Sequence, residues 1–201
     1  MKRTSPKSEW LERLPHSQMI YPEALTHRIK YYLWRLYTPY HPKVRDSVTT
    51  LRILKNHGRQ PFLLGKISPK YTIQEFVEFL TEKGYAYHRV AWMDPDEVVS
   101  LRYVENFIYQ YHIRIYKDRE IRGHYEYTPE CYPLLHLFDI GREPRREEFL
   151  ALFGEMIIPH TSADRSEYRW EFLPARRRLW NRKKHAEASR GAPTRPNTDR
   201  K

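Results

Sequence analysis

Residues 107–127 read FIYQYHIRIYKDREIRGHYEY, the most regularly alternating stretch of the chain. Apolar and polar side chains follow one another with a period of two on both sides of a Lys117–Asp118–Arg119 turn, which is typical of strands with one buried face. The stretch therefore predicts a β-hairpin. Its apolar parity comprises Phe107, Tyr109, Tyr111, Ile113, Ile115, Ile121, Tyr125 and Tyr127.

The loop length sets the register of this hairpin. A three-residue loop pairs Ile115 with Ile121 and His112 with His124, whereas a two-residue loop would set Ile115 opposite Arg122 and reverse the faces. A register shifted by two changes the pairs but keeps the same side chains together. We expect this second surface, the hairpin polar face, to be accessible to solvent. It comprises Gln110, His112, Arg114, Tyr116, Arg122, His124 and Glu126.

Other elements follow from periodicity and from helix start and stop signals. Strands are expected at 61–68, 85–93, 98–104 and 168–172, and helices at 22–37, from Pro42 to Gly58, at 72–83 and from Pro144 onward. The helix at 72–83 has a Thr72–Glu75 capping box. The two N-terminal helices are expected to form an antiparallel or crossed pair.

The helix at 22–37 has two distinct faces. Its apolar stripe holds Leu25, Ile29, Tyr32, Leu33 and Leu36, whereas the other face shows His27, Arg28, Tyr31, Trp34 and Arg35. The second face mixes rings with cations, which suits either base stacking or packing against another element. Packing is the simpler interpretation.

These elements predict an α+β domain with an antiparallel meander of four to five strands and helices on one face. We divide the chain into an N-terminal extension at 1–20, a single domain at 21–173 and a basic tail at 174–201. The tail is expected to be partly helical and then disordered.

Composition excludes several classes of protein. No apolar run approaches the roughly 20 residues of a membrane span. Glycine is scarce, at 7 residues, and neither GxGxxG nor GxxxxGK(S/T) occurs, which argues against Rossmann enzymes and P-loop NTPases. The single cysteine, Cys131, excludes an internal disulfide and suits a reducing, cytoplasmic compartment.

The net charge of +11 is concentrated at one end. Residues 174–201 hold ten Lys or Arg against two acidic residues, whereas residues 21–173 are nearly neutral, with 22 basic and 21 acidic residues. Clustered cations bind polyanions by displacing counterions, so the tail indicates RNA, another polyanion or an anionic membrane surface. A solvated terminus that keeps the protein soluble is the alternative. The cluster comprises Arg176, Arg177, Arg178, Arg182, Lys183 and Lys184.

The hairpin polar face supports three kinds of chemistry. His112, His124 and Glu126 are a possible site for a divalent metal or for acid–base catalysis, since two imidazoles and a carboxylate suit both. Gln110, Arg114, Tyr116 and Arg122 are candidates for binding RNA on a sheet surface. Against all three stands a structural network in which these groups satisfy one another beneath a packed neighbour.

Other polar residues are weaker candidates. Cys131 lies in PECYP and is expected to be a buried or incidental thiol. Asp94, Asp96 and Glu97 could hold a divalent cation, but their sequence is typical of a turn, and a turn is the preferred interpretation. His136 and His160 are expected on a helix flank and a loop.

We therefore expect a small nucleic-acid-binding accessory protein, with RNA favoured, in which the tail supplies affinity and the hairpin polar face supplies contacts. The alternatives are a hydrolase acting on phosphate-containing substrates through His112, His124 and Glu126, with Arg114 and Arg122 clamping the anion, or a protein-interaction module without catalysis.

Overall fold

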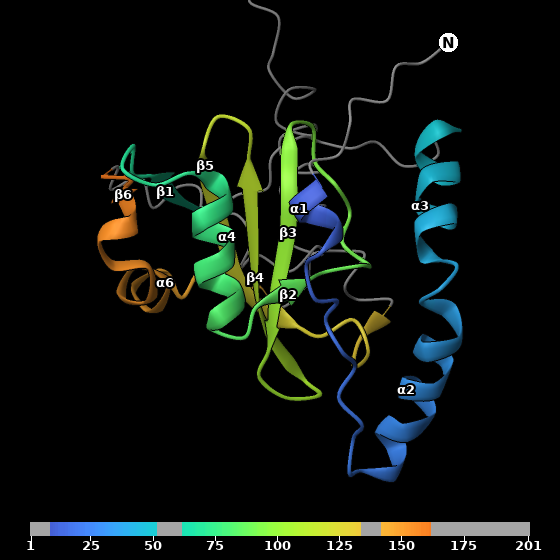
Figure 1. Cartoon of the computed structure of the whole chain (residues 1–201). Coiled ribbons are helices and arrows are strands. Elements are labelled where there is room, and N and C mark those ends of the chain that lie inside the picture. Colours follow the sequence, from blue (N-terminus) through green and yellow to red (C-terminus); the bar gives the residue numbers. More distant parts are fainter. Residues whose placement is uncertain (1–8, 52–61, 134–141, 162–201) are drawn as a thin grey trace, which may run out of the picture.

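The fold was analysed in a computed structural model, which describes residues 9–51, 62–133 and 142–161. The helices are α1 (Glu9–Glu12), α2 (Leu25–Tyr37), α3 (His41–Thr50), α4 (Ile73–Glu82), α6 (Arg146–Phe153) and the 3₁₀-helix η1 (Gly154–Met156). The strands are β1 (Leu63–Ile67), β2 (Ala86–Tyr87), β3 (Glu97–Val104), β4 (Tyr109–Tyr116), β5 (Glu120–Tyr127) and β6 (Ile157–Pro159). This is an α+β fold, as predicted (Figure 1).

The six strands form one antiparallel sheet in the order β2-β3-β4-β5-β1-β6. The central hairpin β4–β5 has the predicted register, with Ile115 opposite Ile121 and His112 opposite His124. Strands β2 to β5 follow one another as a meander. The first strand in the sequence, β1, pairs with β5, the last strand of this meander. On its other edge β1 pairs with β6, a strand that the sequence did not predict.

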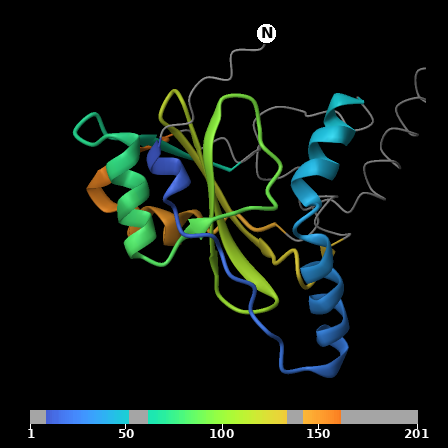
Figure 2. The ribbon, with the colours of Figure 1, turned by 45° about the vertical axis from the view of Figure 1, so that its right-hand side comes forward.

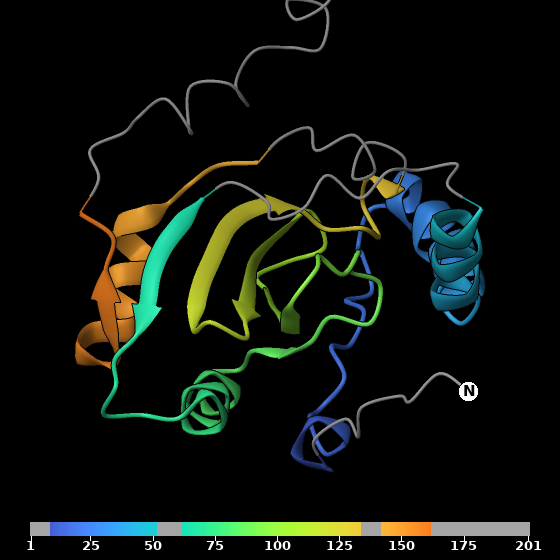
Figure 3. The same cartoon turned by 90° about the horizontal axis from the view of Figure 1, so that it is seen from above.

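The hydrophobic core lies between one face of the sheet and the helices α4 and α6. Alternate residues of the strands, including Leu101 and Ile113, are fully buried there against Phe76 of α4 and Phe149 of α6. Figure 3 shows α4 and α6 beside the sheet, with α2 and α3 far from both. The helices of the core therefore cover one face, and the other face of the sheet carries the polar side chains.

The helix α4 forms where its sequence signals place it. The Thr72 side chain accepts a hydrogen bond from the backbone of Glu75, whose carboxylate accepts one in return from the Thr72 backbone, so the predicted capping box is confirmed. Phe76, Val77 and Leu80 are buried on one side. Pro144 precedes α6, as expected, and the helix itself begins at Arg146.

The strand predicted at 85–93 is mostly wrong, since β2 contains only Ala86 and Tyr87. A turn ends it: the Ala91 N–H donates to the carbonyl of His88 over 3.2 Å. The aromatic and β-branched content of this stretch reflects burial of its side chains rather than extension of its backbone, since Val90 and Ala91 are buried outside any strand.

The two N-terminal helices are not antiparallel or crossed. Figures 1 and 2 show α3 continuing beyond the end of α2, so that the two form one long rod at the side of the molecule. Backbone hydrogen bonds run through the connection, from the Thr38 N–H to the Trp34 carbonyl and from the Val44 N–H to the Tyr40 carbonyl. Thr38 has right-handed helical angles, so the chain bends little there.

The apolar stripe of α2 faces outward. Leu25, Leu33 and Leu36 are 73%, 63% and 71% exposed, whereas Trp34 on the opposite side is 8% exposed. The inward side contacts the body through rings and cations. The His27 ring stacks on Phe107, and Lys30 lies over the Tyr132 ring. Within the described residues, the apolar face of the sheet is covered by α4 and α6, and no residue of the α2 stripe belongs to the hydrophobic core.

No helix within the described ranges is both long and apolar enough to cross a membrane. The strand expected at 168–172, the basic tail at 174–201 and the last part of the helix expected from Pro42 lie outside the described residues.

Two adjacent substitutions test the orientation of α2. Trp34→Ala should lower the free energy of unfolding by about 3 kcal/mol, because a large buried ring is lost. Leu33→Ser should change it by no more than about 0.5 kcal/mol, because this side chain is already in solvent. Urea unfolding with an unchanged m-value measures both. The opposite ranking would show that the stripe faces the core.

Candidate functional site

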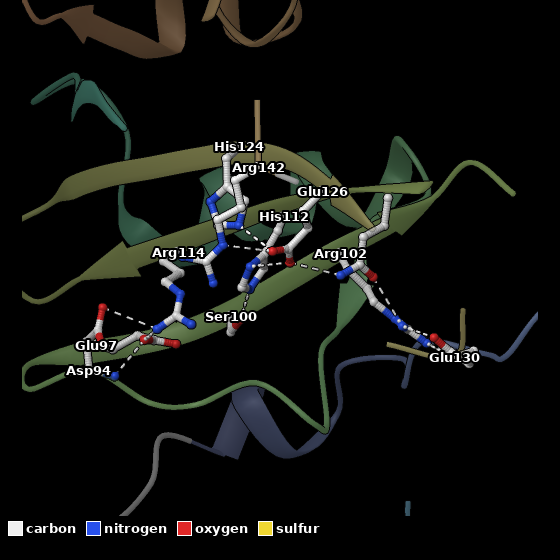
Figure 4. A network of polar contacts seen from close by, with 11 residues as sticks. Asp94, Glu97, Ser100, Arg102, His112, Arg114, His124, Glu126, Glu130 and Arg142 are labelled. Carbon is white, nitrogen blue, oxygen red and sulfur yellow. Dashed lines mark hydrogen bonds and ion pairs between the residues drawn. The ribbon is translucent and has the colours of Figure 1, made fainter. Parts of the chain in front are cut away.

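The polar centre of the protein is formed by alternate side chains of β3, β4 and β5 on the sheet face that is turned away from the core. Strand pairing sets Arg102 opposite His112 and His112 opposite His124, while Gln110 lies opposite Glu126. Figure 4 shows His112, His124 and Glu126 pointing toward one another from neighbouring strands. The predicted sorting of the hairpin into two faces is therefore confirmed.

The carboxylate of Glu126 lies at the middle of this centre. Its Oε1 accepts a hydrogen bond from Gln110 Nε2 at 3.0 Å and lies 3.2 Å from His112 Nδ1. Its Oε2 lies 2.9 Å from His124 Nε2 and accepts a hydrogen bond from Arg142 Nε at 3.0 Å. Four side chains thus contact one buried carboxylate.

His112 connects this carboxylate to a hydroxyl group. Its second ring nitrogen, Nε2, lies 2.6 Å from Ser100 Oγ. The order hydroxyl, imidazole, carboxylate is that of a nucleophile with its base and orienting group. Such a relay requires the Nδ1–H of His112 to point at Glu126.

The ring geometry does not meet this requirement. Although His112 Nδ1 and His124 Nε2 both lie within contact distance of Glu126, neither nitrogen makes a properly directed hydrogen bond. The N–H direction of each ring nitrogen therefore does not point at the carboxylate oxygen that lies next to it. This geometry does not fit a proton relay.

Burial changes the protonation of both rings. His112 and His124 are 1% and 2% exposed. Burial lowers the pKa of His112 well below its usual value, and it lowers that of His124 to about 4, although Glu126 acts in the opposite direction on both. Both imidazoles are therefore neutral near pH 7, the form in which a histidine binds a metal ion.

Two further arginines form ion pairs beside the centre. Arg102 forms a two-bond pair with Glu130, with distances of 2.7 and 3.1 Å, and also donates to Gln110 and to Ser17 Oγ. At the other end of the sheet, Arg114 contacts Glu97 at 2.9 Å and Asp94 at 3.2 Å. Burial raises the pKa of Glu97, an effect that Arg114 opposes.

The prediction that the hairpin polar face is accessible to solvent is wrong. Gln110, Arg114 and Tyr116 are 0%, 3% and 0% exposed, and each is hydrogen-bonded within the protein. Arg122 is 12% exposed in its side chain and forms an ion pair with Glu120 at 2.6 Å. These four side chains therefore present no surface for RNA, and neither arginine is positioned as a clamp for an external anion.

His112, His124 and Glu126 are brought together as predicted. One donor atom from each lies within 4.8 Å of the others, and all three residues are buried. The candidate cations of the tail, Arg176, Arg177, Arg178, Arg182, Lys183 and Lys184, lie outside the described residues, as does His136.

The weaker candidates have ordinary explanations. Cys131 is fully buried, and burial raises the pKa of its thiol, so it is not an activated nucleophile. Asp94 and Glu97 form the predicted turn and bind Arg114. His160 is exposed.

Four members of the polar centre were not identified from the sequence: Ser100, Arg102, Glu130 and Arg142. Only Ser100 and Arg102 leave a readable signal, because they share a parity in the strand predicted at 98–104. Assigning these two residues to the polar centre from their shared parity also requires the β3–β4 register, in which Ser100 lies opposite Arg114. Glu130 and Arg142 reach the centre from outside the regular strands, so no periodicity points to them.

Tyrosine rings occupy the other face of the same sheet. Tyr103, Tyr111 and Tyr125 lie on neighbouring strands, with ring centroids 6.4 and 4.8 Å apart. Beside them is a pocket of about 300 Å³, lined partly by Lys83 and Glu148. Tyr125 is buried here, whereas Tyr103 is exposed.

No protein-family model, curated protein or solved structure matches the chain.

The two neutral histidines predict a loss of stability in acid. Because the unfolded chain binds protons near pH 6.5 and the folded chain binds them only at lower pH, the free energy of unfolding should fall as the pH drops from about 6.5 to 4. For His124 the loss is of the order of 3 kcal/mol over this interval. Urea unfolding of EDTA-treated protein at stepped pH measures it.

His124→Gln isolates this contribution, since an amide replaces the ring without titrating. The variant should show a shallower decline of stability below pH 6.5, while His160→Gln, at an exposed histidine, should follow the wild type. Parallel curves for wild type and His124→Gln would mean that His124 is already charged in the folded protein.

Proposed function

We propose that the protein binds a divalent transition-metal ion through His112, His124 and Glu126, and that this centre supplies its chemistry. The observation that carries the proposal is the grouping of three buried donors: one ligand atom from each residue lies within 4.8 Å of the others. The two ring nitrogens lie 3.2 and 2.9 Å from the oxygens of Glu126, and neither approaches them with the angle of an ordinary hydrogen bond.

The spacing of the donors supports a small ion. Ligands about 2.0–2.1 Å from a tetrahedral zinc ion are roughly 3.3–3.5 Å apart. The two nitrogen–oxygen distances are slightly shorter, and the three donors lie within 4.8 Å of one another. A small opening of the site therefore accommodates the ion. Two imidazoles and one carboxylate favour zinc, iron or cobalt over magnesium and calcium, which prefer oxygen ligands alone.

Neighbouring side chains hold the three ligands in place. Ser100 contacts the second nitrogen of His112 at 2.6 Å, and Gln110 and Arg142 each donate to one oxygen of Glu126. Metal-binding histidines regularly have such a partner on the opposite ring nitrogen, which fixes the tautomer and the ring orientation. Arg142 also partly neutralises Glu126, so metal affinity should be lower than for an unpaired carboxylate.

The chemistry of this donor set is hydrolytic. A zinc-class ion with three protein ligands supplies Lewis-acid chemistry for attack on an ester or phosphoester bond. The three side chains would bind and orient the ion, and Ser100, Gln110 and Arg142 would position them. A hydrolase acting on phosphate-containing substrates is the enzymatic form of this proposal, and it requires the centre to open to the substrate, because His112, His124 and Glu126 are all buried. It does not use Arg114 or Arg122, since both contact carboxylates.

Metal binding is tested on the wild-type chain. Purified protein that is stripped with EDTA and then titrated with Co²⁺ should take up one ion per chain, with visible absorption bands typical of a four- or five-coordinate site. Zn²⁺ should displace the bands. His112→Ala and His124→Ala should each lower the affinity by at least about tenfold, whereas His160→Ala should bind as the wild type does.

The wild-type measurement is decisive by itself. If folded wild-type protein takes up no Co²⁺ or Zn²⁺ at micromolar concentration, the polar centre is a structural network. Should His112→Ala and His124→Ala bind the ion as tightly as the wild type, the ion lies elsewhere. Hydrolysis of a chromogenic phosphoester that follows metal occupancy would add the catalytic step.

We also propose nucleic-acid binding, because the basic residues are concentrated in one segment of the chain. Residues 174–201 have ten basic side chains against two acidic ones, while the domain before them is nearly neutral. Such a segment binds single-stranded RNA through phosphates and without sequence preference. The hairpin polar face has no part in this version, because its side chains are buried.

Replacing the six basic residues between Arg176 and Lys184 by Gln tests this second proposal. The slope of log K against log salt for a single-stranded RNA should become shallower by up to about 4, at roughly 0.7 per phosphate contact. Removing 174–201 should weaken binding further. An unchanged slope in both variants would exclude the segment as the RNA-binding element.

A further inference from the structure

The rod formed by α2 and α3 exposes more apolar side chains than any other part of the described chain. Of the thirteen large apolar residues that are exposed, seven lie on this rod between Leu25 and Val44. They are Leu25, Ile29, Tyr32, Leu33, Leu36, Tyr40 and Val44. Scattered apolar residues on a surface are ordinary, whereas a continuous row of this kind marks a contact surface.

The first five of these residues, the α2 stripe, form a broad band along the helix. At about 100° per residue, they fall within an arc of about 100°. This is wider than the narrow seam of a two-stranded coiled coil, which uses only two positions in seven. The α2 stripe is therefore suited to a flat apolar layer.

Basic side chains flank the α2 stripe along one edge. On the same helical wheel, Arg28 and Arg35 lie beyond that edge, whereas Lys30 lies beyond the other edge and turns inward over the Tyr132 ring. Between Leu25 and Thr50 the rod carries five basic residues and one acidic residue, Asp46. Arg45 is bonded to Ala91 and Asp46, whereas Arg35 and Lys43 are exposed. A second copy of the same rod would bring these like charges together, so charge complementarity favours an anionic occupant.

We propose that the α2–α3 rod docks on the surface of an anionic lipid bilayer. The apolar band would enter the boundary between headgroups and acyl chains, and the flanking cations would contact lipid phosphates and carboxylates. Tyr32 and Tyr40, both exposed, suit this depth because their rings are apolar and their hydroxyls polar. The opposite side of α2 is held on the domain by His27, Lys30 and Trp34.

The position of the rod in the molecule permits this contact. Figures 1 and 2 show α2 and α3 as one elongated element at the flank of the protein, on the side away from α4 and α6. A planar partner can thus approach the rod along its length. The polar centre does not contribute to this surface, so the inference is independent of the proposed metal site.

Flotation with lipid vesicles tests the inference. Wild-type protein should float with phosphatidylcholine vesicles that contain phosphatidylserine and should stay behind with phosphatidylcholine alone. The double variant Leu33→Ser, Leu36→Ser should reduce the bound fraction by roughly tenfold or more, because two inserted side chains are lost. Ile158→Ser, at an apolar side chain on β6 that is 56% exposed, should bind as the wild type does.

A second double variant measures the contribution of the cations to vesicle binding separately from that of the apolar band. Arg35→Gln with Lys43→Gln should weaken binding to anionic vesicles, with a loss that disappears at high salt. Lys70→Gln, at an exposed lysine in the turn between β1 and α4, is the control. Circular dichroism confirms that each variant is folded.

Three outcomes would overturn the inference. The first is a wild-type protein that does not bind anionic vesicles. The second is binding that the two serine substitutions leave unchanged, which would assign it to other basic residues, including those at 174–201. The third is a wild-type dimer that the serine substitutions convert to a monomer without any difference in vesicle binding, which would make a second copy of the chain the occupant.

Discussion

The pairing of β4 with β5 is the constraint on which the rest of the structure depends. Its three-residue turn fixes the register, and the register decides that Ile113, Ile115 and Ile121 face α4 and α6 while His112, His124 and Glu126 face the other way. A shift by one residue would bury the charges in the apolar core. Both the core and the polar centre are therefore consequences of one hairpin.

The second face is unusual because it is polar and also buried. Removing charged groups from water is costly unless each finds a partner, and here Arg102 pairs with Glu130, Arg114 with Asp94 and Glu97, and Arg142 with Glu126. Apolar side chains of similar size would fill such a space at lower cost. This makes the polar centre a better candidate for function than for stability alone.

The sequence predicts what local periodicity controls. The hairpin register, the α4 capping box and the α+β class all follow from spacing of a few residues. Sheet order does not, because β1 pairs with β5 and β6 through contacts distant in sequence. The closeness of His112, His124 and Glu126 was predictable for the same reason as the register, whereas their burial was not. Alternation assigns side chains to a face of the sheet, but it carries no information about what covers that face.

The same distinction explains α2, where periodicity located the helix but the apolar stripe faces outward. Partition between water and core is a property of the whole domain, and here α4 and α6 had already occupied the apolar face of the sheet. The protein thus departs twice from the usual pattern, with charged groups inside at Glu126 and leucines outside at Leu33 and Leu36. Departures of this kind cost stability in an isolated chain and are retained where a ligand or partner offsets them. The proposed metal ion would offset the first departure, and the proposed lipid bilayer, which is anionic at its surface and apolar inside, would offset the second.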